Sequence, residues 1–298
     1  MKKLYIHIGL PKTATSSIQS FLFKQNDTFL KKHGYHYINT GLGIDLKCHH
    51  NLIWTLGLHQ GPDFVPKDIQ KHKDETLQKL AAENAQHSDK HLIISSELLT
   101  FLDDFKKLAP ILEIFKNRDI KFIVNLRRQD TFLESLYQQI VKDGLDETFK
   151  TWFSKTRNAA DYNQLIKNIL QVTEKEKIAI GTFNNSHKRE FNPIKAFLPL
   201  IDIYDETITI ENIYTNKRLP TTCIKIIQLS NSLNLKINHR LVDFFLKHKN
   251  IMRLLDNNGK YLDNEQRAVI REEYKASNKA LTQQIEMPLD VKNEILSW

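Results

Sequence analysis

The chain has 298 residues, of which 41% are hydrophobic, and it contains only 9 glycines and 8 prolines. This length suits one large domain or a domain with an added lobe, and the composition excludes collagen-like and low-complexity chains. The formal net charge of +8 fits an anionic ligand, a polyanionic acceptor or a nucleic acid and does not choose among them.

Two further features of the sequence limit what the protein can be. Cys48 and Cys223 lie far apart and show neither a metal-binding nor a disulfide spacing. No stretch approaches the roughly 20 apolar residues that span a bilayer. The short apolar run after Met1 leads into Pro11 and Lys12 and not into a small-residue cleavage site. We therefore expect a cytoplasmic protein without a membrane span, and the sequence does not indicate its oligomeric state.

The first clear element is a strand that ends in a loop. Apolar residues alternate with Tyr5 and His7 from Leu4 to Ile8, as is typical of a buried strand. Gly9 and Pro11 then end it.

A helix is expected directly after this loop. Ser16 and Gln19 have the spacing of a capping box, and they predict a helix from about Ser16 to Lys32 that ends at Gly34. The free backbone N–H groups of its first turn, next to Lys12, favour an anion. The loop is not the ATP and GTP motif G-x-x-x-x-G-K-[ST], because no glycine directly precedes Lys12.

The next segment combines a short strand and a long loop. Tyr35 to Ile38 is the strand, and the loop from Asn39 to Pro66 carries a short helix. Loops of this size near a phosphate site commonly hold substrate contacts. His49 and His50 lie in it, and although two histidines could bind a metal, no third ligand accompanies them at a suitable spacing.

A carboxylate ends the next strand. Pro66 is placed as the first residue of a helix. After that helix, the apolar strand that begins at His91 ends in Ser-Ser-Glu, and Glu97 should therefore lie where a parallel sheet binds ligands. A helix from about Asp103 to Lys116 follows.

The stretch from Ile120 to Gln139 forms a second strand, loop and helix. Arg127 and Arg128 follow the strand, and Thr131 with Glu134 has the spacing of another capping box. Two arginines before a helix start predict a second anion site.

Both stretches resemble one family, the PAPS-dependent sulfotransferases of the bacterial, P-loop-like type; PAPS is 3′-phosphoadenosine 5′-phosphosulfate. The family's 5′-phosphosulfate loop reads Pro-Lys-[Ser/Thr]-Gly-Thr-[Thr/Ser], and its counterpart here is Pro11, Lys12, Thr13, Ala14, Thr15, Ser16 and Ser17. The match departs at Ala14, where a positive φ would strain an alanine. Arg127, with Ser135 eight positions later, resembles the family's 3′-phosphate signature, and Arg128 is expected to be a surface or supporting charge.

The resemblance implies a nucleotide-binding enzyme that transfers a sulfuryl group from PAPS to a hydroxyl, with a saccharide favoured as the acceptor. It implies that Lys12 stabilises the leaving phosphate and that no metal is needed. The general base is expected to be Glu97, with His50 next and His49 also considered. The family's glycine-rich loop after the sheet has no counterpart here, so the adenine contacts stay open.

We expect an α/β, three-layer fold with a parallel sheet of about five strands and helices on both faces. The strands begin near Leu4, Tyr35, Leu92, Phe122 and Ile178, and Asp161 with Tyr162 starts a helix before the last of them. Residues 1–205 are predicted to form the core and residues 206–298 a helical lobe. The lobe's helices are expected at Thr221 to Leu233, Arg240 to Leu255, and Asn264 to Ile285, the last capped by Asp263.

Three alternatives remain. A nucleotide or small-molecule kinase with a degenerate P-loop would require Mg²⁺. The second alternative is a non-catalytic protein that binds a polyanion or nucleic acid, and its binding would weaken as the salt concentration rises. The sequence shows no nucleic-acid-binding motif, so we expect no nucleic-acid partner. A sulfotransferase-like protein that has lost its activity is the third, because of Ala14.

Overall fold

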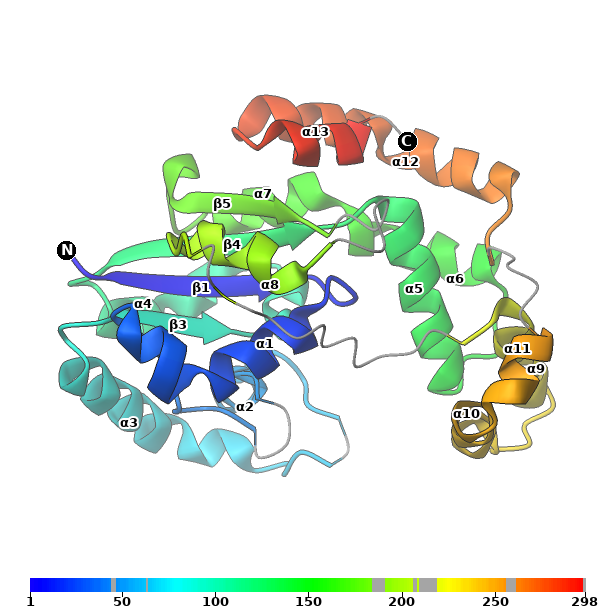
Figure 1. Ribbon diagram of the computed structural model, residues 1–298, viewed down its shortest axis with the longest axis horizontal. Helices are drawn as coiled ribbons and strands as arrows, with labels where there is room; N and C mark the ends of the chain where they lie inside the picture. The colour runs from blue at the N-terminus through cyan, green and yellow to red at the C-terminus, as the bar shows by residue number, and fades with distance from the viewer. Residues whose placement is uncertain are drawn as a thin grey trace.

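A five-stranded parallel sheet forms the centre of the molecule, in the order β2-β3-β1-β4-β5 (Figure 1). The computed structural model describes residues 1–43, 47–62, 64–183, 191–205, 208, 219–255 and 261–296. The strands are β1 (Lys3–Gly9), β2 (Tyr35–Tyr37), β3 (His91–Ser95), β4 (Asp119–Leu126) and β5 (Ile178–Thr182). The predicted fold class and all five strands are confirmed.

The central strand β1 pairs with β3 on one side and β4 on the other. Leu4, Ile6 and Ile8 are fully or almost fully buried, and Tyr5 and His7 between them are buried as well. Helices cover both faces of a parallel sheet. The more polar residues that alternate with the aliphatic ones in β1 therefore do not face solvent. At the carboxyl ends of the strands, Gly9 lies opposite Asn125 of β4.

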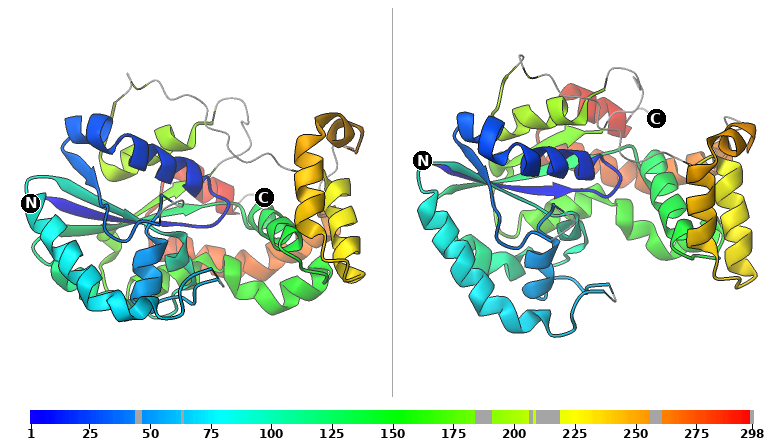
Figure 2. Two further views of the ribbon diagram at one scale, coloured as in Figure 1. Left: turned by 90° about the horizontal axis from the view of Figure 1, so that it is seen from below. Right: turned by 60° about the horizontal axis from the view of Figure 1, so that its bottom comes forward.

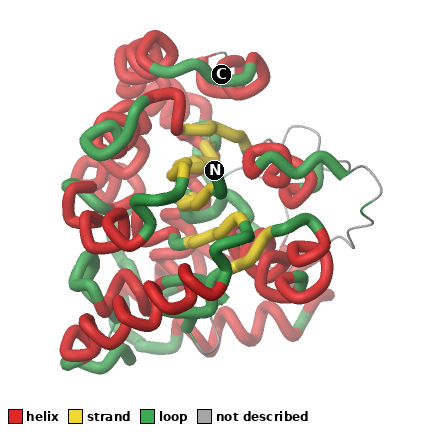
Figure 3. The backbone as a smooth tube through the Cα atoms, turned by 90° about the vertical axis from the view of Figure 1, so that its left-hand side faces the viewer, coloured by secondary structure: helices red, strands yellow, loops and turns green. Residues whose placement is uncertain are grey.

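Helices cover both faces of the sheet, as the end view shows (Figure 3). One face packs against α1 (Thr15–Lys24), α8 (Pro193–Phe197) and the short helix η7 (Leu198–Ile201). The other face packs against a larger apolar core. Its helices before β5 are α2 (His50–Thr55), α3 (Lys73–Gln86), α4 (Ala109–Ile114), α5 (Gln129–Lys142), α6 (Phe149–Thr156) and α7 (Tyr162–Ile169).

The first helix is shorter than predicted. It ends at Lys24, and a π-helical turn (Asn26–Leu30) follows. The Asn26 amide exchanges two hydrogen bonds with the backbone of Tyr37 in β2, at 2.9 and 2.7 Å. Asn26 thus pairs with the backbone of Tyr37 at the open edge of the sheet. Gly34 has φ of 77° and confirms the predicted left-handed end of this segment.

Both predicted capping boxes are wrong. α1 begins at Thr15 and α5 at Gln129, and neither helix has a side-chain cap. The Gln19 amide donates to the Ser95 hydroxyl at 3.2 Å, and Glu134 pairs with Arg267. The side chains of Gln19 and Glu134, which the local pattern assigned to helix caps, therefore bind residues that are distant in the sequence.

Two further helix starts are displaced. Pro66 lies before a short 3₁₀ helix (Ile69–His72) that leads into α3, and so it is not the first residue of a helix. The helix expected from Asp103 divides into a 3₁₀ helix (Phe105–Leu108) and α4, whose first turn contains a proline. Proline is favoured in a first helical turn because its missing N–H would be unpaired there anyway.

The remaining helices are α9 (Thr221–Ser232), α10 (Asn238–Lys247), α11 (Lys249–Leu255), α12 (Asn264–Gln284) and α13 (Leu289–Leu296). Asp263 caps α12, as predicted, and forms a full capping box with Gln266. The Asp161 side chain caps α7 by accepting the Gln164 N–H. The segment predicted as one helix from Arg240 is two helices. Figure 2 shows α9, α10 and α11 on the side of α5 that faces away from the sheet. Helix α12 packs against α5 and α7, and α13 packs against β5. The predicted boundary at residues 205 and 206 falls where the described residues break off.

A membrane-spanning helix needs both length and apolar character. No helix in the described parts of the chain combines the two.

Candidate active site

The loop between β1 and α1 has an unusual backbone. Lys12 and Ala14 both have positive φ, 66° and 63°, and the Thr13 between them is tied to the Leu10 carbonyl by its N–H (3.3 Å) and its hydroxyl (2.7 Å). Left-handed residues in such a turn direct successive N–H groups toward one side, which favours an anion. Ala14 therefore occupies the strained conformation that its sequence position suggested, at a cost of roughly 1–2 kcal/mol for its Cβ.

The strand end and the helix start are in close contact. A Cβ on Gly9 would collide with the Thr15 methyl group and lie 3.0 Å from Cε1 of His7. Only glycine fits at this position. Of the predicted loop residues, Thr13, Thr15 and Ser17 are buried, Pro11, Lys12 and Ala14 are half-buried, and Ser16 is exposed.

One face of α5 lies against this loop. The Lys12 ammonium donates to Oε1 of Gln139 at 3.1 Å, and Thr131 accepts a hydrogen bond from Arg127. Ser135 lies between Thr131 and Gln139 at intervals of four residues, and residues four apart share a helix face. The half-buried Ser135 is thus on the side of α5 that meets the loop.

Arg127 connects the two predicted anion sites. Its Nη1 donates to the carbonyl oxygen of Lys12 at 2.7 Å, and its Nε donates to the Thr131 hydroxyl at 3.1 Å. Its guanidinium also lies 5.2 Å from the centre of the Phe183 ring. Arg128 turns elsewhere and pairs with both oxygens of the buried Asp130, at 2.6 and 3.0 Å. The two stretches therefore form one basic site at the mouth of β1 and β4.

Glu97 begins a 3₁₀ helix (Glu97–Phe101) directly after β3. Burial raises the pKa of its carboxyl group to about 7, although the positive charge of Lys12 acts in the opposite direction. Burial likewise lowers the pKa of Lys12, and the charge of Glu97 partly restores it. A carboxyl with a pKa near 7 can accept a proton at neutral pH, as a general base must.

His50 lies at the start of α2, beside the same mouth. Its Nδ1 is 2.9 Å from the Ser96 hydroxyl, and its ring meets that of Trp54 edge to face at 5.6 Å. Burial, with a smaller contribution from His59, lowers the pKa of His50 to about 4, so its imidazole is neutral at pH 7. The structure thus brings both predicted bases, His50 and Glu97, to adjoining segments.

His49 has a structural role and is not a candidate base, which corrects the sequence-based assignment. Its Nδ1 accepts the Ser95 backbone N–H at 3.0 Å, and its Nε2 donates to the Ile38 carbonyl at 2.8 Å. Both nitrogens are therefore used to join the loop to β3 and to Ile38, the residue after β2. Burial lowers the pKa of His49 to about 4 and keeps it neutral.

A buried polar network under the loop was not foreseen. The His7 ring accepts from the Asn125 amide at Nε2 (3.3 Å), and its Nδ1 then donates to the Ser95 hydroxyl (2.8 Å). Gln19 of α1 bonds the same hydroxyl. Burial lowers the pKa of His7 to about 3, so the ring stays neutral. The network holds β1, β3, β4 and α1 in one arrangement around the mouth.

Sequence reasoning also missed Gln139 and Lys142 on α5. Gln139 holds Lys12, and burial together with the charge of Lys12 lowers the pKa of Lys142. The available signal was helical spacing, because Gln139 and Lys142 follow Ser135 at four and seven residues.

Comparison with known proteins finds only distant likeness, to solved structures. No family model and no curated protein matches the chain. Among solved structures, the protein is similar to a sulfotransferase domain from the curacin biosynthetic pathway, with 14% sequence identity and a TM-score of 0.40. The alignment covers 96% of this chain and 99% of that domain. We draw no functional conclusion from a likeness at this level.

Proposed function

We propose that the protein transfers a sulfuryl group from PAPS to an acceptor hydroxyl. The observation that carries the proposal is the hydrogen bond from Arg127 to the Lys12 carbonyl, at 2.7 Å. It makes one continuous site of two anion-binding units, as a donor with phosphate groups at both its 5′ and 3′ positions requires. Glu97 adds a proton acceptor near Lys12.

In this proposal the loop N–H groups and Lys12 hold the 5′-phosphosulfate, and Arg127 and Ser135 hold the 3′-phosphate. The acceptor oxygen attacks sulfur and loses its proton to Glu97. The bond between sulfur and the bridging oxygen breaks, and PAP leaves with the electron pair. Lys12 stabilises the negative charge that develops on that oxygen, so it contributes more in the transition state than in the ground state.

We favour a saccharide as the acceptor. Two exposed aromatic rings lie near His50 and Glu97: Phe64 packs edge to face on Trp54 at 6.1 Å, and Phe101 lies 6.0 Å from His59. Phe101 ends the same 3₁₀ helix that Glu97 begins. Exposed rings beside a polar site suit a ligand that has an apolar face and many hydroxyl groups, as a sugar ring has.

A thermal shift screen tests the donor class. PAP, ATP and GTP are compared with and without Mg²⁺. A ligand at about one hundred times its dissociation constant stabilises a protein by roughly 2.7 kcal/mol, which is easily measured. We expect stabilisation by PAP without metal. A response to ATP with Mg²⁺ and none to PAP would replace the proposal with the kinase alternative.

A further inference from the structure

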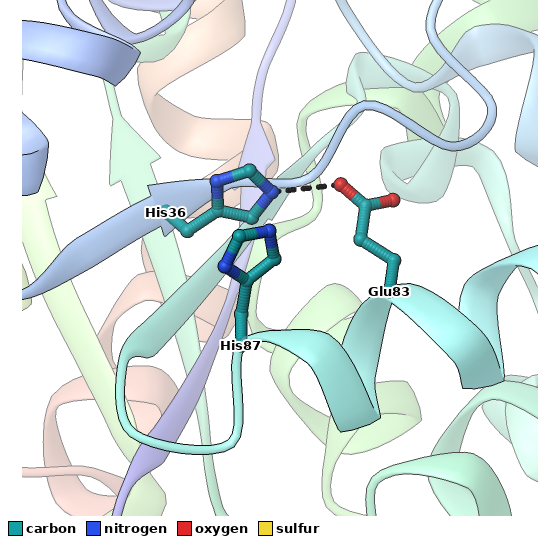
Figure 4. Close-up of side chains that lie close together, drawn as sticks. All are labelled: His36, Glu83 and His87. Atoms are coloured by element: carbon teal, nitrogen blue, oxygen red, sulfur yellow. Dashed lines mark hydrogen bonds and ion pairs between the residues drawn. The ribbon is translucent and has the colours of Figure 1, made fainter.

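We propose that His36, Glu83 and His87 form a binding site for a transition metal ion such as Zn²⁺ (Figure 4). His36 lies on β2, at the edge of the sheet, whereas Glu83 lies on α3 and His87 directly follows that helix. The site shares no residue with the candidate active site, and the proposal is independent of sulfuryl transfer.

The ligand atoms already lie close together. Nε2 of His36 is 2.7 Å from Oε1 of Glu83, and one ligand atom from each of the three residues lies within 4.8 Å of the others. Figure 4 shows the His87 ring lying against the His36 ring, and the ring centres are 3.7 Å apart. Two imidazoles and one carboxylate are a common protein ligand set for zinc, with water as the fourth ligand.

The surroundings fix the carboxylate and leave room for a water ligand. The Asn39 N–H donates to Oε1 of Glu83 at 2.7 Å, and the Thr40 N–H and hydroxyl donate to Oε2 at 2.9 and 2.6 Å. Such outer hydrogen bonds orient metal ligands. An open cavity of about 370 Å³ adjoins Glu83 and His87. Lys79 also lines it, with its ammonium bonded to Glu75 at 2.7 Å.

Metal binding requires the ligands to move. Tetrahedral zinc at about 2.0–2.2 Å from each ligand separates the ligand atoms by roughly 3.3 Å. The ion would thus take the place of the proton between His36 and Glu83 and move these atoms apart by about half an ångström. The lone pairs of the stacked His36 and His87 rings lie in the ring planes, so His87 must turn out of the stack to reach the ion. Its partial burial after the end of α3 allows this turn. Zinc would then join the edge strand β2 to α3.

Isothermal titration of the EDTA-treated full chain with ZnCl₂ tests the proposal. We expect one zinc per chain, and His87→Ala should weaken binding by at least about tenfold, because even outer-shell changes cost 10–100-fold. His72→Ala is the matched control, since His72 is an exposed histidine at the start of the same helix, and it should leave the affinity unchanged.

A second readout excludes loss of folding as the explanation. Co²⁺ should give the intense visible absorption of a tetrahedral site in the wild-type chain and not in His87→Ala, while the melting temperature of metal-free His87→Ala stays close to that of the wild type. The proposal is overturned if the wild-type chain does not bind zinc, or if His87→Ala binds it as tightly.

Discussion

Glu97 and Lys12 lie close enough for each charge to shift the pKa of the other. They come from the ends of neighbouring parallel strands, β3 and β1. The pair therefore places a proton acceptor next to the cation that is proposed to hold the leaving group.

Glu97→Gln should lower turnover by at least about a hundredfold and keep PAP affinity. The amide is nearly isosteric but cannot accept the proton, and a placed base contributes a factor of 10² to 10⁴. Single-turnover kinetics and PAP titration measure the two effects. If Glu97→Gln stays active while His50→Ala loses turnover with PAP binding intact, His50 is the base.

The pH profile separates the same two residues without a mutation. A base works in its deprotonated form, so kcat/KM should fall as the pH drops below about 7, the pKa to which burial raises Glu97. With His50 as the base, the profile would stay flat until about pH 4. The negative charge of bound PAPS should raise the pKa of the neighbouring Glu97 carboxyl. Because kcat reports the complex and kcat/KM the free enzyme, the loss of kcat on acidification should begin at a higher pH than the loss of kcat/KM.

Lys12→Ala should lower turnover by roughly a hundredfold or more, by analogy with removal of one oxyanion donor. Gln139→Ala is the matched comparison, because it removes only the side chain that holds the Lys12 ammonium. Its effect on kcat should be smaller than that of Lys12→Ala. Near-normal turnover in Lys12→Ala would remove Lys12 from the mechanism.

Arg127→Ala should weaken PAP more than adenosine 5′-phosphate, which lacks the 3′-phosphate. Some loss for both ligands is expected, because Arg127 also supports the Lys12 carbonyl. Arg127→Lys should restore binding only in part, since lysine cannot donate two parallel hydrogen bonds to a phosphate. Equal weakening of the two ligands, measured by titration, would show that Arg127 acts only through the loop.

Ala14→Gly should stabilise the protein by up to about 1 kcal/mol. Glycine removes the Cβ strain of the left-handed conformation, and its greater freedom in the unfolded chain offsets part of the gain. Urea denaturation with an unchanged m-value measures this difference. PAP affinity should rise or stay the same, and a large loss of affinity would contradict the role given to this loop.

The strands, and the strand–loop–helix units that carry Lys12 and Arg127, could be predicted because their signals are local. Alternating or continuous apolar residues mark β1, β3 and β4, and Lys12 and Arg127 directly follow strands. Helix starts were less predictable. Gln19 and Glu134 had the right spacing for caps, but Ser95 and Arg267, distant in the sequence, bind them instead.

Most of what sequence reasoning missed depends on contacts between distant segments. His7 reads as one more residue of a strand, and only the fold places Asn125 and Ser95 on either side of it. His49 and His50 are adjacent in the sequence and equivalent by pattern. The structure separates them, because His49 bonds two backbone groups, whereas Nδ1 of His50 contacts the Ser96 hydroxyl beside the mouth.

Arg267 of α12 ties a late segment of the chain to the first turns of α5. Its guanidinium bonds the carboxylates of Asp130 and Glu134 in the first turns of α5, and all three side chains are buried. Asp130 keeps its pairing with Arg128, whereas leaving the buried Glu134 without its cation costs about 3–5 kcal/mol. Until α12 has emerged from the ribosome, α5 lacks this support. We therefore expect the growing chain to acquire ligand binding only after α12 has been made.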